Sequence, residues 1–146
     1  MISLRDITKE NYEAICDLEV TESQEDYVAG NTWSIVESVF NDNYTARAIY
    51  QQNTPVGMLM WVKESNKKVS IWRFMVDQQF QQGGVGRKAM SLALEEIKQD
   101  IDLDEIEICY VPSNPVAKNF YGSFGFVEVG MDDDNEEMLA ILKLTN

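Results

Sequence analysis

The sequence predicts a mixed α/β (α+β) domain in which helices cover both faces of a largely antiparallel sheet of about seven strands. Its 146 residues, 45% of them hydrophobic, are enough for one ordinary domain with its own core. Three neighbouring segments of strand character, residues 45–51, 55–62 and 68–76, are separated by short turn-like sequences, as in an antiparallel meander. Segments with apolar residues at helical spacing lie on both sides of this meander. Because no repeat or linker divides the sequence, we expect residues 1–146 to form a single domain.

The first forty residues predict one strand followed by helices. Residues 2–7 alternate in the manner of a short strand, and residues 8–20 follow as a helix for which Thr8 is the expected N-cap. Residues 23–40 carry apolar side chains at helical spacing, with an interruption near Gly30, which predicts one or two short helices. The chain therefore begins β-α-α before it enters the meander.

The half that follows the meander predicts alternating helices and strands. In order, the expected elements are a helix over residues 89–97, a strand over 105–111, a helix beginning at Pro115, and strands over 126–131 and 138–144. Asn114 is the expected N-cap of the second of these helices, and Gly125 lies just past its end. The acidic turn DDDNEE between the last two strands is typical of a solvated hairpin, and a rim that collects cations is the alternative. The complete order is β-α-α-β-β-β-α-β-α-β-β.

The composition excludes several kinds of site. The chain has no histidine, which removes Ser-His-Asp and Cys-His catalysis and every His-ligated metal site, and we expect no bound metal. Its 12 Lys plus Arg against 25 Asp plus Glu give a formal net charge of −13, which repels nucleic acid and anionic membranes. The same charge attracts a cationic partner, or it serves only to keep the protein soluble.

Hydropathy and cysteine usage predict a cytoplasmic protein. The longest apolar run falls far short of the roughly 20 residues that cross a bilayer, and the N-terminus has no signal-peptide pattern. Cys16 and Cys109 lie in apolar stretches far apart in sequence, so we expect buried thiols and no disulfide. The tryptophans are expected in the core or in the wall of a cleft, and not as a nucleotide-stacking platform: Trp33, Trp61 and Trp72.

A glycine-rich turn joins the last strand of the meander to the following helix, in the segment DQQFQQGGVGRKAM (residues 77–90). The free N–H groups and positive dipole end of a helix start favour an anionic phosphate, and glycines let the backbone approach it. Arg87 and Lys88 add positive charge there. The turn lacks the Walker pattern, and its match to a dinucleotide fingerprint fails because DQQFQ separates it from the strand. A tight turn without a ligand is the alternative.

The same turn fits the pattern Q-x-x-G-x-G, at Gln81, Gly84 and Gly86, and here the chain resembles the GNAT superfamily of acetyl-CoA-dependent N-acetyltransferases. A second family pattern, N-x-x-A-x-x-x-Y-x-x-x-G-F, is matched downstream by Asn114, Ala117, Tyr121, Gly125 and Phe126. The first three of these residues share one helix face. The two motifs occur in the family's order, with the expected elements between them.

The segment LEVTESQEDYVAGNTWSIVES is similar to the opening segment of bacterial polyamine and diamine N-acetyltransferases, with matches at Gln24, Tyr27, Val28, Asn31 and Ser34. This resemblance implies transfer of an acetyl group from acetyl-CoA to a primary amine of a spermidine- or spermine-like polyamine. It also allows another amine, such as a peptide N-terminus, an aminoglycoside or a small amino compound. A non-catalytic acidic binding module on the same fold is a further alternative. The resemblance allows a homodimer.

The resemblance implies which residues form the site. Coenzyme contacts are expected from Phe74, Met75, Val76, Gln81, Gln82, Gly83, Gly84, Val85, Gly86, Arg87, Lys88, Asn114, Ala117 and Tyr121. Acceptor contacts are expected from Glu22, Gln24, Tyr27, Glu37 and Trp72. The acids proposed to hold distal ammonium groups of a polyamine are Glu22, Glu25, Asp26 and Glu37. For each of these acids alone, a solvated helix face is the alternative.

Attack of an amine on a thioester requires a neutral amine, a stabilised carbonyl oxygen and a proton for the departing thiolate. Tyr121 is the expected proton donor, because transfer from a phenol of pKa about 10 to a thiolate of pKa about 8.5 is uphill by only about 2 kcal/mol. A backbone N–H near Met75 or Val76 is implied as the donor to the oxyanion. Trp72 stands near the position where some relatives carry a glutamate base, so we expect a water chain that ends on a more distant carboxylate.

Overall fold

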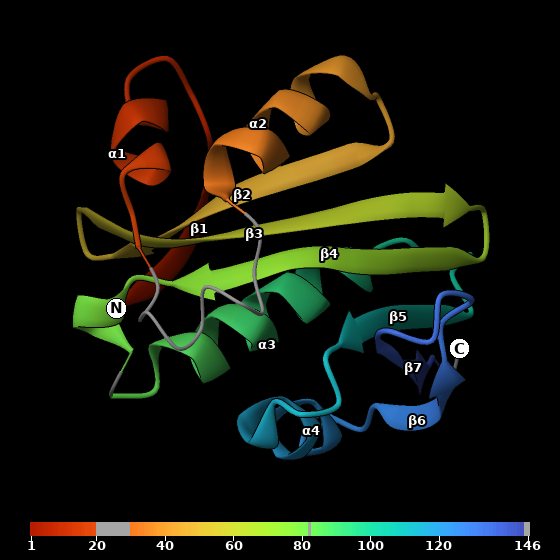
Figure 1. The fold of residues 1–146 in the computed structure, drawn as a ribbon. Coiled ribbons are helices and arrows are strands. Elements are labelled where there is room, and N and C mark those ends of the chain that lie inside the picture. The colour runs from red at the N-terminus through yellow and green to blue at the C-terminus, as the bar shows by residue number, and fades with distance from the viewer. Residues whose placement is uncertain (20–29, 82, 145–146) are drawn as a thin grey trace.

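Seven strands form one sheet in the computed structural model, which describes residues 1–19, 30–81 and 83–144 (Figure 1). The strands are β1 (Ile2–Asp6), β2 (Tyr44–Gln51), β3 (Thr54–Ser65), β4 (Lys68–Val76), β5 (Glu105–Tyr110), β6 (Val127–Met131) and β7 (Met138–Lys143). The α-helices are α1 (Tyr12–Cys16), α2 (Asn31–Phe40), α3 (Val85–Ile97) and α4 (Pro115–Gly122), and a short 3-10 helix, η2, covers Gln78–Phe80. The predicted fold class and element order are confirmed.

The sheet has the strand order β1-β2-β3-β4-β5-β7-β6. The predicted meander is present, because β2, β3 and β4 pair as antiparallel neighbours. The chain then crosses through α3 to β5, which pairs with β4 in parallel, while β7 pairs antiparallel with both β5 and β6. The acidic segment that follows β6 forms the predicted hairpin with β7. None of the described helices combines the length and the apolar character needed to span a membrane.

Two hydrophobic clusters lie on opposite faces of the sheet. The cluster on the α3 side includes Val85, Ala89 and Met90 of that helix. On the α1 and α2 side, Ile15 packs with Met58, Met60 and Met75. Figure 1 shows α1 and α2 over one face of the sheet and α3 and α4 over the other, as predicted. Both faces are buried because the strands present apolar side chains alternately to each side.

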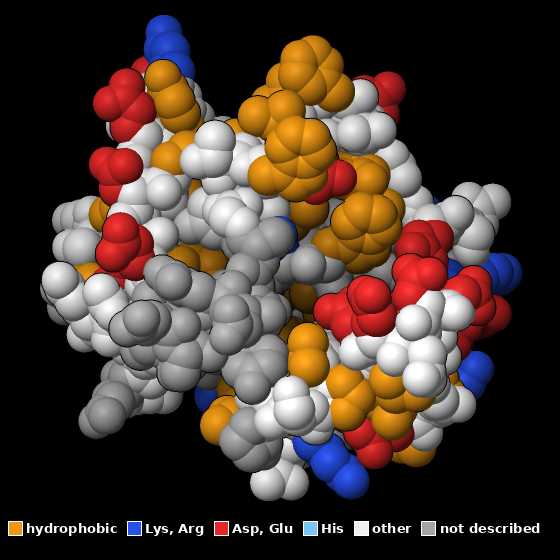
Figure 2. All heavy atoms as spheres, in the orientation of Figure 1, with side chains coloured by type: hydrophobic (Ala, Val, Ile, Leu, Met, Phe, Trp, Pro, Cys, Tyr) orange, Lys and Arg blue, Asp and Glu red, His pale blue; other side chains and the backbone are white. Residues whose placement is uncertain are grey.

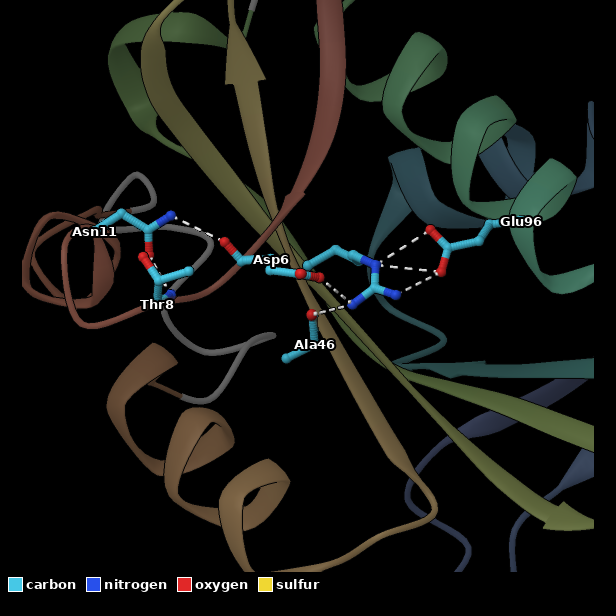
Figure 3. A network of polar contacts seen from close by, with 6 residues as sticks. Asp6, Thr8, Asn11, Ala46 and Glu96 are labelled. Atoms are coloured by element: carbon cyan, nitrogen blue, oxygen red, sulfur yellow. Dashed lines mark hydrogen bonds and ion pairs between the residues drawn. The ribbon is translucent and has the colours of Figure 1, made fainter.

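Arg47 on β2 forms ion pairs with β1 and with α3, and its partners Asp6 and Glu96 are labelled in Figure 3. Its Nη1 lies 3.0 Å from the carboxylate of Asp6 on β1, and its Nη2 lies 2.8 Å from the carboxylate of Glu96 on α3. The guanidinium also lies 5.8 Å from the centroid of the Trp61 ring. One side chain therefore joins two strands to the helix that begins at the glycine turn.

The first helix is shorter than predicted, and Thr8 is not its N-cap. The N-cap is Asn11, and α1 begins at Tyr12. The Asn11 side chain accepts a hydrogen bond from the Thr8 N–H at 2.7 Å and donates one to the Asp6 carbonyl at 3.0 Å (Figure 3). These local bonds form a turn over the residues that the sequence assigned to the first helical turn. The helix predicted within residues 23–40 is found as α2, and residues 20–29 lie outside the described residues.

Burial differs from the prediction at both cysteines, and it separates the three tryptophans. Both cysteines are free, as expected, but Cys16 is only half-buried, and Cys109 is exposed because the alternation of β5 points it away from the core. Trp61 is buried, whereas Trp72 is 46% exposed and Trp33 is 66% exposed on α2. Trp33 and Trp72 therefore lie outside the core, and the wall of a cleft remains the predicted place for them.

Candidate active site

An opening in the sheet separates β4 from β5. The two strands pair only from Lys68 to Ile71 on β4, opposite Glu105 to Ile108 on β5. Beyond that point β4 runs on along β3, and β5 runs on along β7. A β-bulge starts the separation, because Trp61 pairs with Ile71 and Met60 with Arg73, which leaves Trp72 as the extra residue.

The β4 backbone presents Val76 to this opening. The Asp77 N–H donates to the Val56 carbonyl on β3 at 2.7 Å. Because the C=O and N–H of a trans peptide point in opposite directions, the Val76 carbonyl points away from β3, and it accepts a hydrogen bond from Gln81 Nε2 at 2.9 Å. In an extended strand the N–H of a residue points to the same side as its carbonyl, so the Val76 N–H also faces the opening.

Met75 has the opposite backbone orientation. Its carbonyl oxygen faces β3, where a Cβ added to Gly57 would clash with it. Its N–H therefore also turns toward β3. Of the two residues that the sequence offered for the oxyanion contact, Val76 has the N–H oriented toward the opening.

The glycine turn leads from η2 into α3. Gly83 has φ 93° and Gly84 has φ 82°, both in the left-handed region that favours glycine. Gly84 is the N-cap of α3 and supplies no side-chain acceptor to the first N–H groups of the helix. These N–H groups and the positive end of the helix dipole are the parts of an anion site. A Cβ at Gly83 or Gly84 would meet no atom within 4 Å, so the space above the turn is open to a ligand among the described residues.

The charged residues of the turn differ in their contacts. The Arg87 guanidinium lies 4.9 Å from the centroid of the Phe124 ring and 5.5 Å from that of Phe120, so it connects α3 to the α4 region. Lys88 is exposed. Val85 is buried beneath the turn, and Gln82 lies outside the described residues.

Asn114 caps α4 as predicted. Its Oδ1 accepts hydrogen bonds from the N–H groups of Val116 at 3.2 Å and Ala117 at 3.3 Å. Ala117 is buried. Gly125, which the sequence placed past the helix end, has φ 102°, as a glycine that ends a helix often does. The capping oxygen of Asn114 is thus occupied, and its amide nitrogen is the atom left for other contacts.

Tyr121 is half-buried at the α4 side of the opening. Its ring stacks on Tyr110, with centroids 5.9 Å apart, and meets Phe120 and Phe126 edge-on. Burial raises the pKa of the Tyr121 phenol above its usual value, and the neighbouring Cys109 and Tyr110 raise it further. The phenol is therefore protonated at neutral pH and can act as a proton donor.

The acceptor residues expected from the sequence fall into two groups. Glu22, Gln24 and Tyr27, with the matching position Val28 and the acids Glu25 and Asp26, lie outside the described residues. The other two, Glu37 and Trp72, are described. Glu37 is half-buried on α2, and Trp72 meets Tyr44 edge-on with ring centroids 5.4 Å apart.

Sequence reasoning missed Arg73, which is only 8% exposed on β4. Its Nε donates to Ser34 Oγ on α2 at 2.7 Å. Burial lowers the pKa of Arg73, and the negative charge of Glu37 opposes that shift. The carboxylate of Glu37 therefore already interacts with a cation of this chain. Asn31 donates to the Ile15 carbonyl on α1 at 2.8 Å. Asn31 and Ser34, the two α2 residues that match the polyamine acetyltransferase segment, therefore connect α2 to α1 and to β4. The signal for Arg73 was a single charge within the apolar strand SIWRFMV.

The surface beside the opening combines apolar and acidic areas. Figure 2 shows hydrophobic side chains gathered over α2 and acidic side chains gathered near β5 and the β6–β7 turn, next to a hollow. The exposed apolar residues of α2 are Trp33, Val36, Val39 and Phe40. An apolar area beside a negative one is suited to an amine with a hydrocarbon body.

Comparison with known proteins agrees with this geometry. Over 150 aligned residues, the chain is 25% identical to the spermine/spermidine N(1)-acetyltransferase of Bacillus subtilis (strain 168), and the alignment covers 98% of this chain and 99% of the relative. Among solved structures, the spermidine N-acetyltransferase from Vibrio cholerae in complex with CoA and spermine has a TM-score of 0.80 at 14% identity, covering 97% of this chain and 95% of that one.

A PaiA N-acetyltransferase from Thermoplasma acidophilum in complex with coenzyme A has a TM-score of 0.74 at 16% identity, covering 99% of both chains. At these identities the structural matches show a shared fold. The model of the acetyltransferase (GNAT) family matches residues 3–126, which include the glycine turn and the motif on α4. The chain therefore belongs to the GNAT family of acetyltransferases, and it is an acyltransferase.

Proposed function

We propose that the protein moves an acetyl group from acetyl-CoA to a primary amine of a polyamine or diamine, such as spermidine or spermine. The observation that carries this proposal is the opening between β4 and β5, with the outward Val76 N–H on one side and protonated Tyr121 on the other. The relative from Bacillus subtilis supports the substrate class, as does the formal net charge of −13, which attracts a polycation.

The residues at the glycine turn fit the coenzyme. The uncapped N–H groups at the start of α3, with Arg87 and Lys88, suit its diphosphate, and the space above Gly83 and Gly84 accommodates it. The parted strands leave backbone groups free to bind the pantetheine arm. The proposed contacts are Phe74, Met75, Val76, Gln81, Gln82, Gly83, Gly84, Val85, Gly86, Arg87, Lys88, Asn114, Ala117 and Tyr121.

The proposed chemistry is direct transfer. The amine nitrogen forms a bond to the thioester carbonyl carbon while the Val76 N–H donates to the developing oxyanion. The carbon–sulfur bond then breaks, and Tyr121 gives its proton to the thiolate. The proton released by the amine passes to water and then to a carboxylate. Burial raises the pKa of the Tyr121 phenol, which keeps the phenol protonated and makes its proton transfer to a thiolate more uphill than the roughly 2 kcal/mol of the free groups.

A thiol-release assay with purified protein, acetyl-CoA and a panel of amines tests this function. Spermidine, spermine, putrescine, butylamine, a peptide with a free N-terminus and an aminoglycoside make up the panel. We expect the highest kcat/KM with spermidine or spermine. Thiol release only with the peptide or only with the aminoglycoside would show that this compound, and not a polyamine, represents the acceptor class. Release with none of the amines would contradict the proposal.

A further inference from the structure

Part of the sheet face on the α2 side extends beyond the helices that cover it. Helices α1 and α2 pack on β2 and β3, while β5, β7 and β6 lie toward the other edge of the sheet (Figure 1). We call the side chains of Glu107, Cys109, Asp132 and Glu137 on this area the acidic shelf. Figure 2 shows acidic side chains gathered here, beside the hollow.

Strand alternation places these side chains together. Ile106, Ile108 and Tyr110 of β5 belong to the core on the α3 side, so Glu107 and Cys109 point to the opposite face. Leu139 on β7 is the register partner of Cys109, and Glu137 lies two residues before it, on the same face.

The surroundings of the Cys109 thiol confirm that the acids converge. Desolvation of the thiol, its interaction with Glu137, and the charges of Glu137, Glu107 and Asp132 together raise the pKa of this thiol to about 12. Cys109 directly precedes Tyr110 on β5, and the ring of Tyr110 stacks on Tyr121, so the shelf adjoins the opening where the thioester is proposed to react.

A buried hydroxyl lies at the floor of the shelf. Ser70 on β4 is the register partner of Glu107 and is only 4% exposed. Lys68, two residues earlier on the strand, reaches Glu107 at 2.9 Å, which shows that this face of β4 meets the shelf. Among the described residues, Ser70 Oγ has no hydrogen-bond partner. A buried polar atom without a partner is rare and unfavourable, so it indicates a polar ligand or its hydrating water at this place.

Trp72 forms the border of the shelf toward α2. The bulge makes it the extra residue of β4, and its contact with Tyr44 places it on the α2 side of the sheet. Its half-exposed indole offers an apolar surface for methylene groups and a π face for a cation.

The carboxylates of the shelf differ in the ion pairs and hydrogen bonds that they already form within the chain. Lys68 pairs with Glu107, and Asp132 Oδ1 accepts hydrogen bonds from the N–H groups of Glu136 and Glu137. In the described part of the chain, Glu137 forms no ion pair with Lys or Arg. Glu137 is therefore the carboxylate best able to receive an external cation.

We infer that the acidic shelf binds a distal ammonium group of the acceptor, with Glu137 as its anchor and Trp72 against the methylene chain. This inference rests on the proposed function and gives it a specific site. A diamine or polyamine reaches both the opening and the shelf, whereas a monoamine reaches only the opening. The shelf thus sets the preference for acceptors with a second positive charge.

The variant Glu137→Gln tests the inference, with Glu95→Gln on the exposed face of α3 as a control that changes the net charge equally. We expect Glu137→Gln to raise KM for spermidine roughly ten-fold or more, the range for one hydrogen bond between charged groups. The kcat/KM for butylamine and KM for acetyl-CoA should stay unchanged. A spermidine KM that matches that of Glu95→Gln, or an equal loss with butylamine, would overturn the inference.

The variant Lys68→Met supplies a second test in the opposite direction. Loss of this ammonium releases Glu107 from its ion pair, so we expect a several-fold lower KM for spermidine. An unchanged or higher KM would overturn the shelf as the ammonium site. Circular dichroism of each variant verifies that it is folded.

The two levels of proposal fail in different ways. If the wild-type protein releases no thiol with any polyamine, the proposed acceptor class is wrong. If the wild-type protein acetylates spermidine while Glu137→Gln behaves like Glu95→Gln, only the shelf is wrong.

Discussion

Replacement of Tyr121 by Phe separates the chemistry of the phenol from its packing. The ring stacks on Tyr110 and contacts Phe120 and Phe126, and phenylalanine keeps all three contacts. Within the described residues the Tyr121 hydroxyl makes no hydrogen bond, so its removal leaves no partner unsatisfied. We expect the thermal midpoint to stay within a few degrees of the wild-type value.

The same substitution removes the proposed proton donor to the thiolate. Loss of a general acid costs about 100- to 10,000-fold in rate, or about 3 to 5 kcal/mol of the activation free energy. We expect kcat in the thiol-release assay to fall by about this factor, with KM for acetyl-CoA changed little. A kcat within two-fold of the wild-type value would remove Tyr121 from the mechanism.

Tyr110→Phe is the matched control, because it removes the hydroxyl of the ring stacked on Tyr121. That hydroxyl donates to the Glu128 carboxylate, so we expect a lower thermal midpoint and a nearly unchanged kcat. A large loss of kcat in Tyr110→Phe together with a small loss in Tyr121→Phe would show that Tyr110, and not Tyr121, is the proton donor.

Three further perturbations follow from the backbone and the buried phenols. Gly84→Ala forces a side chain into a left-handed conformation and should cost about 1–2 kcal/mol of unfolding free energy and weaken coenzyme A binding by calorimetry, whereas Gly122→Ala, inside α4, should leave binding unchanged. Gly57→Ala should cost about 1–3 kcal/mol in urea unfolding, because its Cβ would press on the Met75 carbonyl. The raised pKa values of Tyr110 and Tyr121 predict full stability below about pH 10 and a progressive loss above it, since the unfolded chain ionises these phenols first; alkaline denaturation followed by tyrosinate absorbance measures this.

Local patterns in the sequence were sufficient for most of the fold. Alternation and helical spacing predict the order of the elements, and the sequence Asn114-Pro115 predicts the cap that starts α4. The prediction fails at Thr8 because two residues suited to cap a helix, Thr8 and Asn11, lie within one turn, and the side-chain bonds of Asn11 decide between them. The sequence predicts Trp33 in the core or in the wall of a cleft; α2 is apolar on several sides, and only packing determines which side is buried.

The site could be predicted only in outline. The motifs predict the glycine turn and Tyr121, because a family pattern marks residues close together in sequence. The choice of Val76 over Met75 depends on the hydrogen bond between Asp77 and Val56 at the end of β4, which no local pattern reveals. Glu137 belongs to the acidic turn DDDNEE, for which the sequence favours a solvated hairpin over a cation-collecting rim, and only the pairing of β5 with β7 brings it beside Cys109.

The parting of β4 from β5 also bears on kinetic order. Coenzyme would enter along α3 and α4, and the amine would enter from the side of α2, so neither would obstruct the path of the other. Both reactants can then be held at once in a ternary complex, without an acetylated enzyme between two half-reactions. Double-reciprocal plots at several fixed amine concentrations should intersect, as in a sequential scheme, and parallel lines would indicate a ping-pong scheme instead.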